Sequence, residues 1–122
     1  MKENFVGFLS IFAKVPTVKG AAARELVSNG AVLLDVRENT EWNAGHAPEA
    51  AHLPLGRITE ASKKVRNGKQ VVVVCRSGNR SRSGAKTLIS MGYDAVSLAG
   101  GMRAWAAAGG KVVDRSGRAV SV

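Results

Sequence analysis

The stretch QVVVV at residues 70–74 restricts the fold of this chain more than any other part of the sequence. Five residues are too few for a typical helix, and valine, which is branched at Cβ, favours strands. No polar residue alternates with the four valines, so both faces of the strand are expected to be covered. Strands of this kind belong to parallel sheets that carry helices on both faces. The stretch therefore predicts an α/β fold with a central, mainly parallel β-sheet.

The rest of the chain alternates between strand-like and helix-like runs, as this fold requires. Strands or extended segments are predicted at 31–36, 51–55, 70–74 and 94–98. Helices are predicted at 18–28, 38–45, 58–67, 81–91 and 101–109. Thr17 is expected to cap the first helix, and Ser81 is expected to open the fourth. With 122 residues, no internal repeat and no low-complexity linker, the chain is expected to be one domain.

The chain carries 18 Lys and Arg residues against 9 Asp and Glu residues, a formal net charge of +9. This excess favours anionic partners, from small oxyanions to nucleic acids. The basic residues are scattered, however, and aromatic residues make up only 5% of the chain. No nucleic-acid-binding signature stands out, so no nucleic-acid partner is predicted.

The apolar run at residues 5–13 is too short to span a bilayer, and no membrane span is predicted. A secretory signal peptide is disfavoured, because Glu3 interrupts the basic region before the run, and Lys14 and Lys19 interrupt the sequence after it. We expect instead an N-terminal strand or amphipathic segment that packs on the domain.

Cys75 is the only cysteine of the chain. It cannot form an internal disulfide, a multi-thiolate zinc site or a Cys-x-x-Cys pair. A free thiol fits a reducing compartment, so a cytoplasmic location is predicted. No metal and no cofactor are expected, because two histidines and one remote cysteine have no ligand spacing that favours a metal.

Cys75 stands where the buried strand gives way to a polar turn centred on Gly78. Reactive groups in parallel sheets gather at the carboxyl ends of strands, beside the N-termini of the helices that follow. Gly78 and Asn79 both tolerate left-handed backbone conformations, so the turn is expected to point its N–H groups inward and to bind anions. The same N–H groups favour the thiolate form of Cys75 over a merely structural thiol. Three arginines add positive charge: Arg76, Arg80 and, as a surface charge on the following helix, Arg82.

Three segments resemble the single-domain rhodanese sulfurtransferases, and they occur in the family's order. They are LLDVRENTEWNAGHAPEAAHLPL (33–55), VVVVCRSGNRS (71–81) and GYDAVSLAGGMRAW (92–105). The second segment resembles the family's active-site loop. The resemblance implies a rhodanese-like domain over 17–110, preceded by a segment, 1–16, and followed by a tail, 111–122, to which no role is assigned. The tail is polar at its centre and is expected to form a loose hairpin or a frayed end.

Few residues depart from the family's usual pattern. Ala47, Glu49 and His52 replace its common isoleucine, glycine and asparagine. These positions lie in a structural segment, so the implied activity is unaffected.

The resemblance implies sulfur transfer in two steps, with Cys75 as the catalytic residue. The Cys75 thiolate takes the outer sulfur of a donor, such as thiosulfate or a low-molecular-weight persulfide, and becomes a persulfide. A nucleophilic acceptor, either cyanide or a thiol, then takes the sulfur. Arg76 is similar to the corresponding residue of thiosulfate-using loops. The residues expected to bind the donor are Arg76, Ser77, Gly78, Asn79, Arg80 and Ser81.

Asp35 and Arg37 lie at the end of the strand predicted at 31–36. They are expected either to support the active loop by hydrogen bonds or to join an ion-pair network with Glu38 or Glu41. Both tryptophans are expected to be packing residues, and Trp42 also to help wall the site.

Other functions fit the Cys75 loop less well. Four residues separate Cys75 from Arg80, which is too short a spacing for a phosphatase loop. Six residues separate Cys75 from Arg82, which is too long. A Cys–His hydrolase needs a base beside Cys75, whereas His46 and His52 are expected to be structural. A non-catalytic rhodanese-like binding module, and a relay that passes sulfur to an acceptor protein, remain alternatives.

Overall fold

The computed structural model of the chain describes residues 15–122. The strand or amphipathic segment predicted at 5–13 lies outside the described residues. Of the helices in 15–122, none has the length and apolar character needed to cross a membrane.

The sheet of the described residues contains five strands, all parallel, in the order β1-β5-β4-β2-β3. The strands are β1 (Thr17–Val18), β2 (Val32–Asp35), β3 (Ala51–His52), β4 (Gln70–Val74) and β5 (Asp94–Leu98). The prediction of an α/β fold with a parallel sheet is confirmed.

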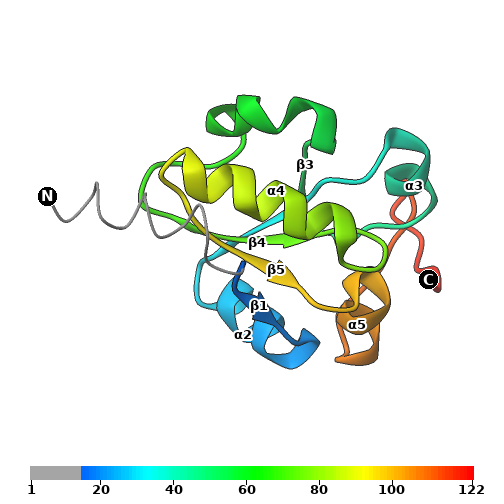
Figure 1. Cartoon of the computed structure of the whole chain (residues 1–122). Helices are drawn as coiled ribbons and strands as arrows, with labels where there is room; N and C mark the ends of the chain where they lie inside the picture. The colour runs from blue at the N-terminus through cyan, green and yellow to red at the C-terminus, as the bar shows by residue number, and fades with distance from the viewer. Residues whose placement is uncertain (1–14) are drawn as a thin grey trace, which may run out of the picture.

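Helices cover both faces of this sheet (Figure 1). Two elements lie on one face: α4 (Asn79–Ser90) and the 3₁₀ helix η1 (Leu55–Lys63). Two lie on the other: α2 (Gly20–Ser28) and α5 (Gly101–Ala107). The short helix α3 (Asn39–Ala44) lies beside the carboxyl ends of the strands, near the C-terminus of the chain. These carboxyl ends are where the loop after β4 emerges.

The four valines of β4 divide between the two faces. Val71 and Val73 pack under η1 and α4, whereas Val72 and Val74 pack against α2 and α5. All four are fully buried. Because successive side chains of a strand point to opposite faces, only a strand covered twice needs an apolar residue at every position. Burying one such side chain contributes about 1.5–3 kcal/mol to folding.

Three predicted element boundaries are wrong, each for a physical reason. Thr17 does not cap a helix but pairs with Ser97 in the sheet, and α2 begins at Gly20. The helix predicted at 58–67 is instead a kinked 3₁₀ segment over Leu55–Lys63, interrupted by non-helical backbone at Arg57 and Glu60. Short 3₁₀ turns of this kind are common, because the hydrogen-bond geometry of a 3₁₀ helix does not favour long runs. Helix α4 begins at Asn79, so Ser81 lies inside its first turn rather than before it.

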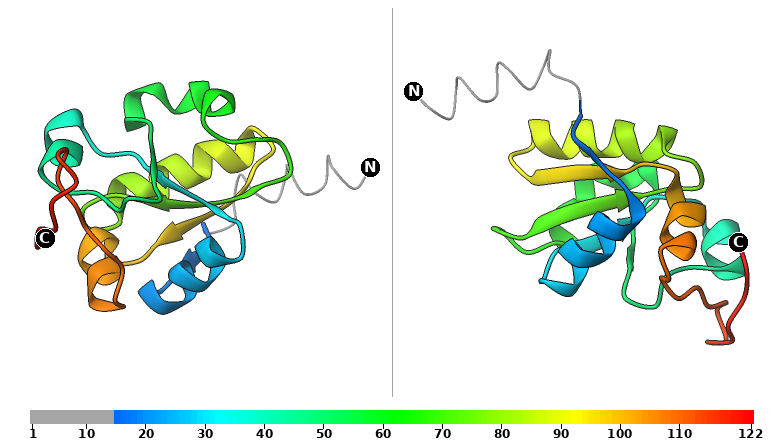
Figure 2. Two further views of the ribbon diagram at one scale, coloured as in Figure 1. Left: turned by 180° about the vertical axis from the view of Figure 1, so that it is seen from behind. Right: turned by 90° about the horizontal axis from the view of Figure 1, so that it is seen from below.

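The C-terminal tail forms a hairpin, one of its two predicted states. Val113 pairs with His46 on one side and with Ala119 on the other, both antiparallel. Asp114 holds the turn, because its Oδ1 accepts hydrogen bonds from Ser116 and Arg118. Figure 2 shows the tail running past α3 and α5, at the end of the molecule where the strands terminate.

Candidate active site

Cys75 follows β4 directly and begins the loop that leads into α4. The residue is 1% exposed, and its side chain joins the cluster under α4. Its place at the carboxyl end of the central strand matches the expected position of a reactive group in a parallel sheet.

Several hydrogen-bond donors surround the Cys75 sulfur. The Gly78 N–H donates to Sγ at 3.1 Å, an orientation that Gly78 reaches with a left-handed φ of 116°. Burial raises the pKa of the Cys75 thiol, but the Ser81 hydroxyl and the N–H groups of Ser81, Gly78 and Ser77 together lower it below its ordinary value. Hydrogen bonds of the loop, including the N–H groups predicted to favour the thiolate, are therefore its chief support, and the predicted contribution of the arginines is not among the main causes. Asn79 has no left-handed conformation, contrary to expectation.

Ser97 lies beneath this loop and was not predicted as a site residue. Its Oγ is 2.7 Å from the Oγ of Ser81, and both side chains are buried. The Ser81 hydroxyl also donates to the Gly78 carbonyl at 3.1 Å. The sequence feature that could have identified Ser97 is that it is a serine within the otherwise apolar core of β5.

A pair of glycines before α5 holds the start of the loop from the other side. The Met102 N–H donates to the Cys75 carbonyl at 2.9 Å. Gly101 has a φ of 62°, and a Cβ at this position would overlap the carbonyl oxygens of Cys75 and Arg76. Gly101 is thus a second residue whose part in the site was not predicted.

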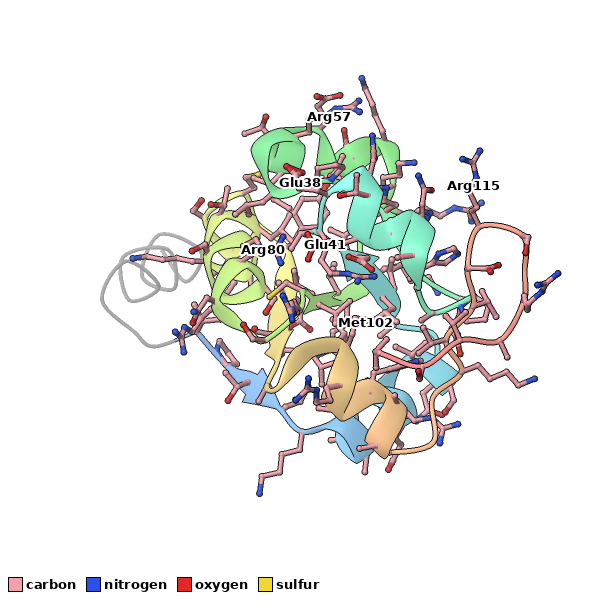
Figure 3. The ribbon with its side chains drawn as sticks, turned by 90° about the vertical axis from the view of Figure 1, so that its right-hand side faces the viewer. Glu38, Glu41, Arg57, Arg80, Met102 and Arg115 are labelled. Carbon is pink, nitrogen blue, oxygen red and sulfur yellow. The ribbon has the colours of Figure 1, made fainter. Side chains whose placement is uncertain are left out.

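Arg80, predicted to bind the donor, is joined to Glu41 of α3. Its Nη1 and Nη2 donate to the Glu41 carboxylate at 2.6 and 2.9 Å, and Figure 3 shows the two side chains pointing toward one another. The Arg80 hydrogen bonds lower the pKa of Glu41 to about 2, and the same pair raises the pKa of Arg80. Arg82 is exposed, as expected, and donates to the Asn79 side chain at 3.2 Å. Arg76 is exposed as well.

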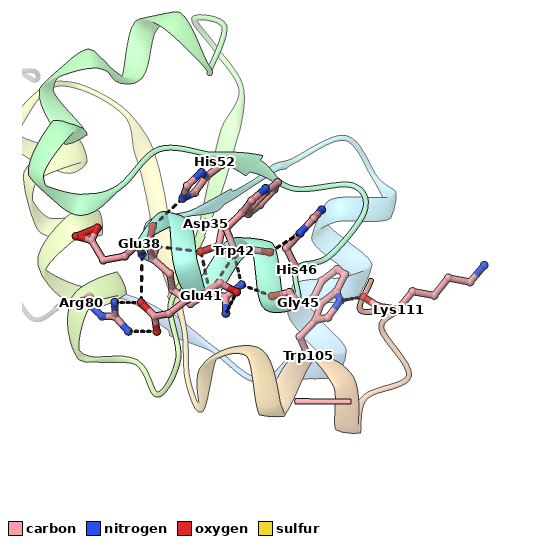
Figure 4. A network of polar contacts seen from close by, with 11 residues as sticks. Asp35, Glu38, Glu41, Trp42, Gly45, His46, His52, Arg80, Trp105 and Lys111 are labelled. Atoms are coloured by element: carbon pink, nitrogen blue, oxygen red, sulfur yellow. Dashed lines mark hydrogen bonds and ion pairs between the residues drawn. The ribbon is translucent and has the colours of Figure 1, made fainter. Parts of the chain in front are cut away.

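Asp35 and Arg37 form a buried ion pair with each other at 2.7 Å (Figure 4). The predicted network of Arg37 with the carboxylates of Glu38 or Glu41 is wrong, since Arg37 donates instead to the Gly45 and Glu41 carbonyls. The pair fixes α3 to the end of β2. It thereby sets the position of Glu41, the partner of Arg80.

Residues 20–108 match the sequence profile of the family described as "Rhodanese-like domain". The chain belongs to this rhodanese-like family.

Named relatives of this rhodanese-like chain are sulfurtransferases. Thiosulfate sulfurtransferase GlpE of Pseudomonas savastanoi pv. phaseolicola is 37% identical over 97 residues, which cover 79% of this chain and 89% of that protein. GlpE of Pseudomonas syringae pv. syringae is 36% identical over 95 residues, 77% of this chain and 87% of that protein. The crystal structure of a rhodanese-related protein from Thermoplasma volcanium has a TM-score of 0.68 at 28% identity, covering 83% of this chain and 98% of that one. The resemblance seen in the sequence is confirmed.

The histidines of this rhodanese-like domain stack on the two faces of Trp42. The ring centroids of His46 and His52 lie 3.7 and 4.6 Å from that of Trp42. Each histidine also bonds a backbone carbonyl, of Trp42 and of Arg37 respectively, at 2.7 Å. Both are therefore occupied in holding α3, as predicted. Within residues 15–122, no three His, Cys, Asp or Glu side chains gather as a metal site.

A cavity of about 250 Å³ adjoins the rhodanese-like loop at Arg76. Helices α3 and α5 form its sides, and the end of the tail closes it. Its lining residues are Arg37, Glu41, Ala44, Gly45, Arg76, Met102, Arg103, Ser121 and Val122. Neither Arg103 nor the tail was predicted to belong to this region, because neither is near Cys75 in the sequence.

Proposed function

We propose that this rhodanese-like chain is a sulfurtransferase that carries a sulfane sulfur as a persulfide on Cys75. The observation that supports this most is the hydrogen bond from the Gly78 N–H to the Cys75 Sγ, within a loop that lowers the pKa of the thiol. A thiolate is the nucleophile that sulfur transfer requires. Donors aimed at that sulfur also stabilise a persulfide anion.

In the first step, the Cys75 thiolate attacks the outer sulfur of thiosulfate. The sulfur–sulfur bond of the donor breaks, and sulfite leaves with its electron pair. In the second step, the carbon of cyanide, or the sulfur of an acceptor thiolate, attacks the outer sulfur of the persulfide. The Cys75 thiolate is released, and the product is thiocyanate or a new persulfide.

The residues of the loop have separate roles in this proposal. Ser77, Gly78 and Ser81 stabilise the anionic sulfur, because their donors lower the pKa of the thiol. Arg76 is exposed at the cavity and attracts the donor. Arg80 and Asn79 act indirectly, by joining the loop to α3 and to the first turn of α4. Asp35 and Arg37 support the site by anchoring α3.

The proposal is tested by intact mass spectrometry of the reduced protein after incubation with thiosulfate. We expect an adduct of one sulfur on the wild type, its absence in Cys75→Ser, and its removal by cyanide with release of thiocyanate. If thiosulfate, mercaptopyruvate and glutathione persulfide all leave the mass unchanged, the protein is not a sulfurtransferase. The non-catalytic binding module would then be the better interpretation.

The same experiment distinguishes an enzyme from a relay. An enzyme returns to the unmodified mass when a small thiol or cyanide is added, whereas a relay keeps its adduct until an acceptor protein is supplied. A lone free thiol performs either role in a reducing compartment, and we propose the cytoplasm.

A further inference from the structure

The basic side chains around the loop fall into two groups. Arg37 and Arg80 are committed to Asp35 and Glu41. Arg76 and Arg103 have no carboxylate within 4.0 Å among residues 15–122, and both line the cavity. Uncommitted guanidinium groups in a concave site are suited to bind a carboxylate or another planar oxyanion in two-pronged fashion.

The cavity is larger than an inorganic donor requires. Its volume of about 250 Å³ has room for several water molecules. Thiosulfate, an ion of five non-hydrogen atoms, would leave much of this space unfilled. The lining is also partly apolar, since Ala44, Met102 and Val122 contribute to it. A mixed lining of this kind fits an organic molecule with charged ends better than a small inorganic ion.

The walls of the cavity are built into the fold. In Figure 3, Glu41 of α3 and Met102 of α5 lie on the same side of the molecule, with Arg80 beside Glu41. Glu41 is the acidic residue among the described lining residues, and Arg80 already offsets its charge. A Cβ placed on Gly45 would lie 3.2 Å from the side chains of Val112 and Val120, so the tail hairpin packs closely on this wall. Among the side chains of the lining, the charge that no partner offsets therefore comes from Arg76 and Arg103.

We propose that Arg103 binds a carboxylate of an organic persulfide whose body occupies this cavity, and that it thereby selects such donors over thiosulfate. This inference rests on the proposed function. In the transfer, the Cys75 thiolate attacks the outer sulfur of the donor R–S–SH. The donor's sulfur–sulfur bond breaks, R–S⁻ leaves with the electron pair, and Cys75 keeps the S–SH group. Arg103 touches the donor's carboxylate and takes no part in the bond changes.

The test compares three donors with three proteins. The donors are thiosulfate, glutathione persulfide and the diethyl ester of glutathione persulfide, which lacks free carboxylates. The proteins are the wild type, Arg103→Gln and the matched control Arg115→Gln. Arg115 is an exposed arginine of the tail hairpin that does not line the cavity, and in Figure 3 its side chain points away into solvent.

We expect Arg103→Gln to lower kcat/KM for glutathione persulfide about tenfold, which is about 1.4 kcal/mol, because the variant loses a charge-assisted contact to the donor's carboxylate. With thiosulfate and with the diethyl ester, Arg103→Gln should stay within about twofold of the wild type. Arg115→Gln should match the wild type with every donor. Circular dichroism of Arg103→Gln checks that the variant is folded.

Two results would overturn the inference while leaving the proposed function intact. One is an equal loss for Arg103→Gln with thiosulfate, ester and acid, which would mean that Arg103 contributes only a general positive field. The other is no loss with any donor. If the wild type itself transfers sulfur from none of the three, the proposed function fails, and the two failures are thus distinguishable.

Discussion

The Ser81 hydroxyl has more possible hydrogen-bond acceptors around it than it has hydrogens to donate. It lies within hydrogen-bonding distance of the Gly78 carbonyl and of the Ser97 hydroxyl, and it lowers the pKa of Cys75. A hydroxyl donates one hydrogen and accepts two. When Ser97 donates to Ser81, the Ser81 hydrogen is free to turn toward the sulfur once the thiol has ionised. The buried serine pair is thus suited to act as an adjustable donor for the charge that appears and disappears on Cys75 in the proposed transfer.

This arrangement predicts the effect of Ser81→Ala on thiol ionisation. Ser81 makes the largest lowering contribution to the pKa of Cys75, so its removal should raise that pKa. The rate of alkylation by iodoacetamide, measured against pH, should show its midpoint at higher pH in the variant. The unpaired Ser97 hydroxyl should also lower the free energy of unfolding by about 1–3 kcal/mol.

Ser83→Ala is the matched control for this prediction, because Ser83 is an exposed serine of the same helix. Its midpoint should equal that of the wild type. An unchanged midpoint in Ser81→Ala would mean that the backbone N–H groups alone hold the thiolate.

At the scale of elements, α5 and the Cys75 loop behave as one unit. Helix α5 begins at Gly101, whose backbone lies against the carbonyl oxygens of Cys75 and Arg76. The Met102 N–H donates to the first of these carbonyls. The position of the sulfur therefore depends on a helix that is separated from it in sequence by α4 and β5.

Gly101→Ala should consequently impair both folding and transfer. The added Cβ meets backbone oxygens that no side-chain rotation can remove, and φ is positive. We expect the free energy of unfolding to fall by more than the approximately 1–2 kcal/mol that a left-handed alanine costs by itself. Loading of Cys75 with sulfur, followed by mass spectrometry, should slow at least tenfold even where the variant is folded.

Gly117→Ala distinguishes the cost of a left-handed alanine from the cost of the overlap with the loop. Gly117 also has a positive φ, 87°, but nothing lies within 4 Å of its Cβ position. Chemical denaturation of this variant should show the conformational cost alone, with sulfur loading unchanged. Equal losses in the two variants would show that contact with the loop adds nothing.

The bounds of helices and strands were predicted best where a single feature of the local sequence determined them. The bounds of β4 and β5 match the prediction, because each apolar run follows a polar residue, Gln70 or Asp94, and reaches a polar or glycine-rich turn within two residues of its end. Helix η1 was mistaken for an ordinary helix, since apolar residues three and four apart suit both helix types. Thr17 was wrongly predicted to cap a helix, because the strand that pairs with it lies far along the chain.

The same distinction applies to the site. The loop from Cys75 to Ser81 is continuous in sequence, so its chemistry could be read directly. Glu41, Ser97 and Gly101 reach it only because the sheet places β2 and β5 on either side of β4. Sequence periodicity contains no information on that strand order, and the contacts were therefore missed.

At the scale of the whole molecule, the formal net charge of +9 should attract anions toward the proposed sulfur-transfer site. Two small reagents of similar size test whether this charge speeds the reaction of anions with Cys75. Iodoacetate is an anion, and iodoacetamide is neutral. Between 0.01 and 1 M salt, the distance over which charges act falls from about 30 Å to about 3 Å. Above the midpoint of Cys75 ionisation, the iodoacetate rate should fall several-fold over this range, whereas the iodoacetamide rate should stay nearly constant. A parallel change in both rates would show that the salt acts on the loop and not on the approach of the anion.

The anchoring of Cys75 also has a consequence for the second step of the proposed sulfur transfer, in which the sulfur leaves the protein. Its carbonyl is tied to Met102, its sulfur to Gly78, and its backbone lies against Gly101. A side chain held in this way does not move between distant sites, as a flexible carrier arm would. The recipient must travel to a stationary sulfur. Small thiols meet that requirement without any special shape, whereas a protein recipient needs its thiol on a projection narrow enough to enter beside α3 and α5.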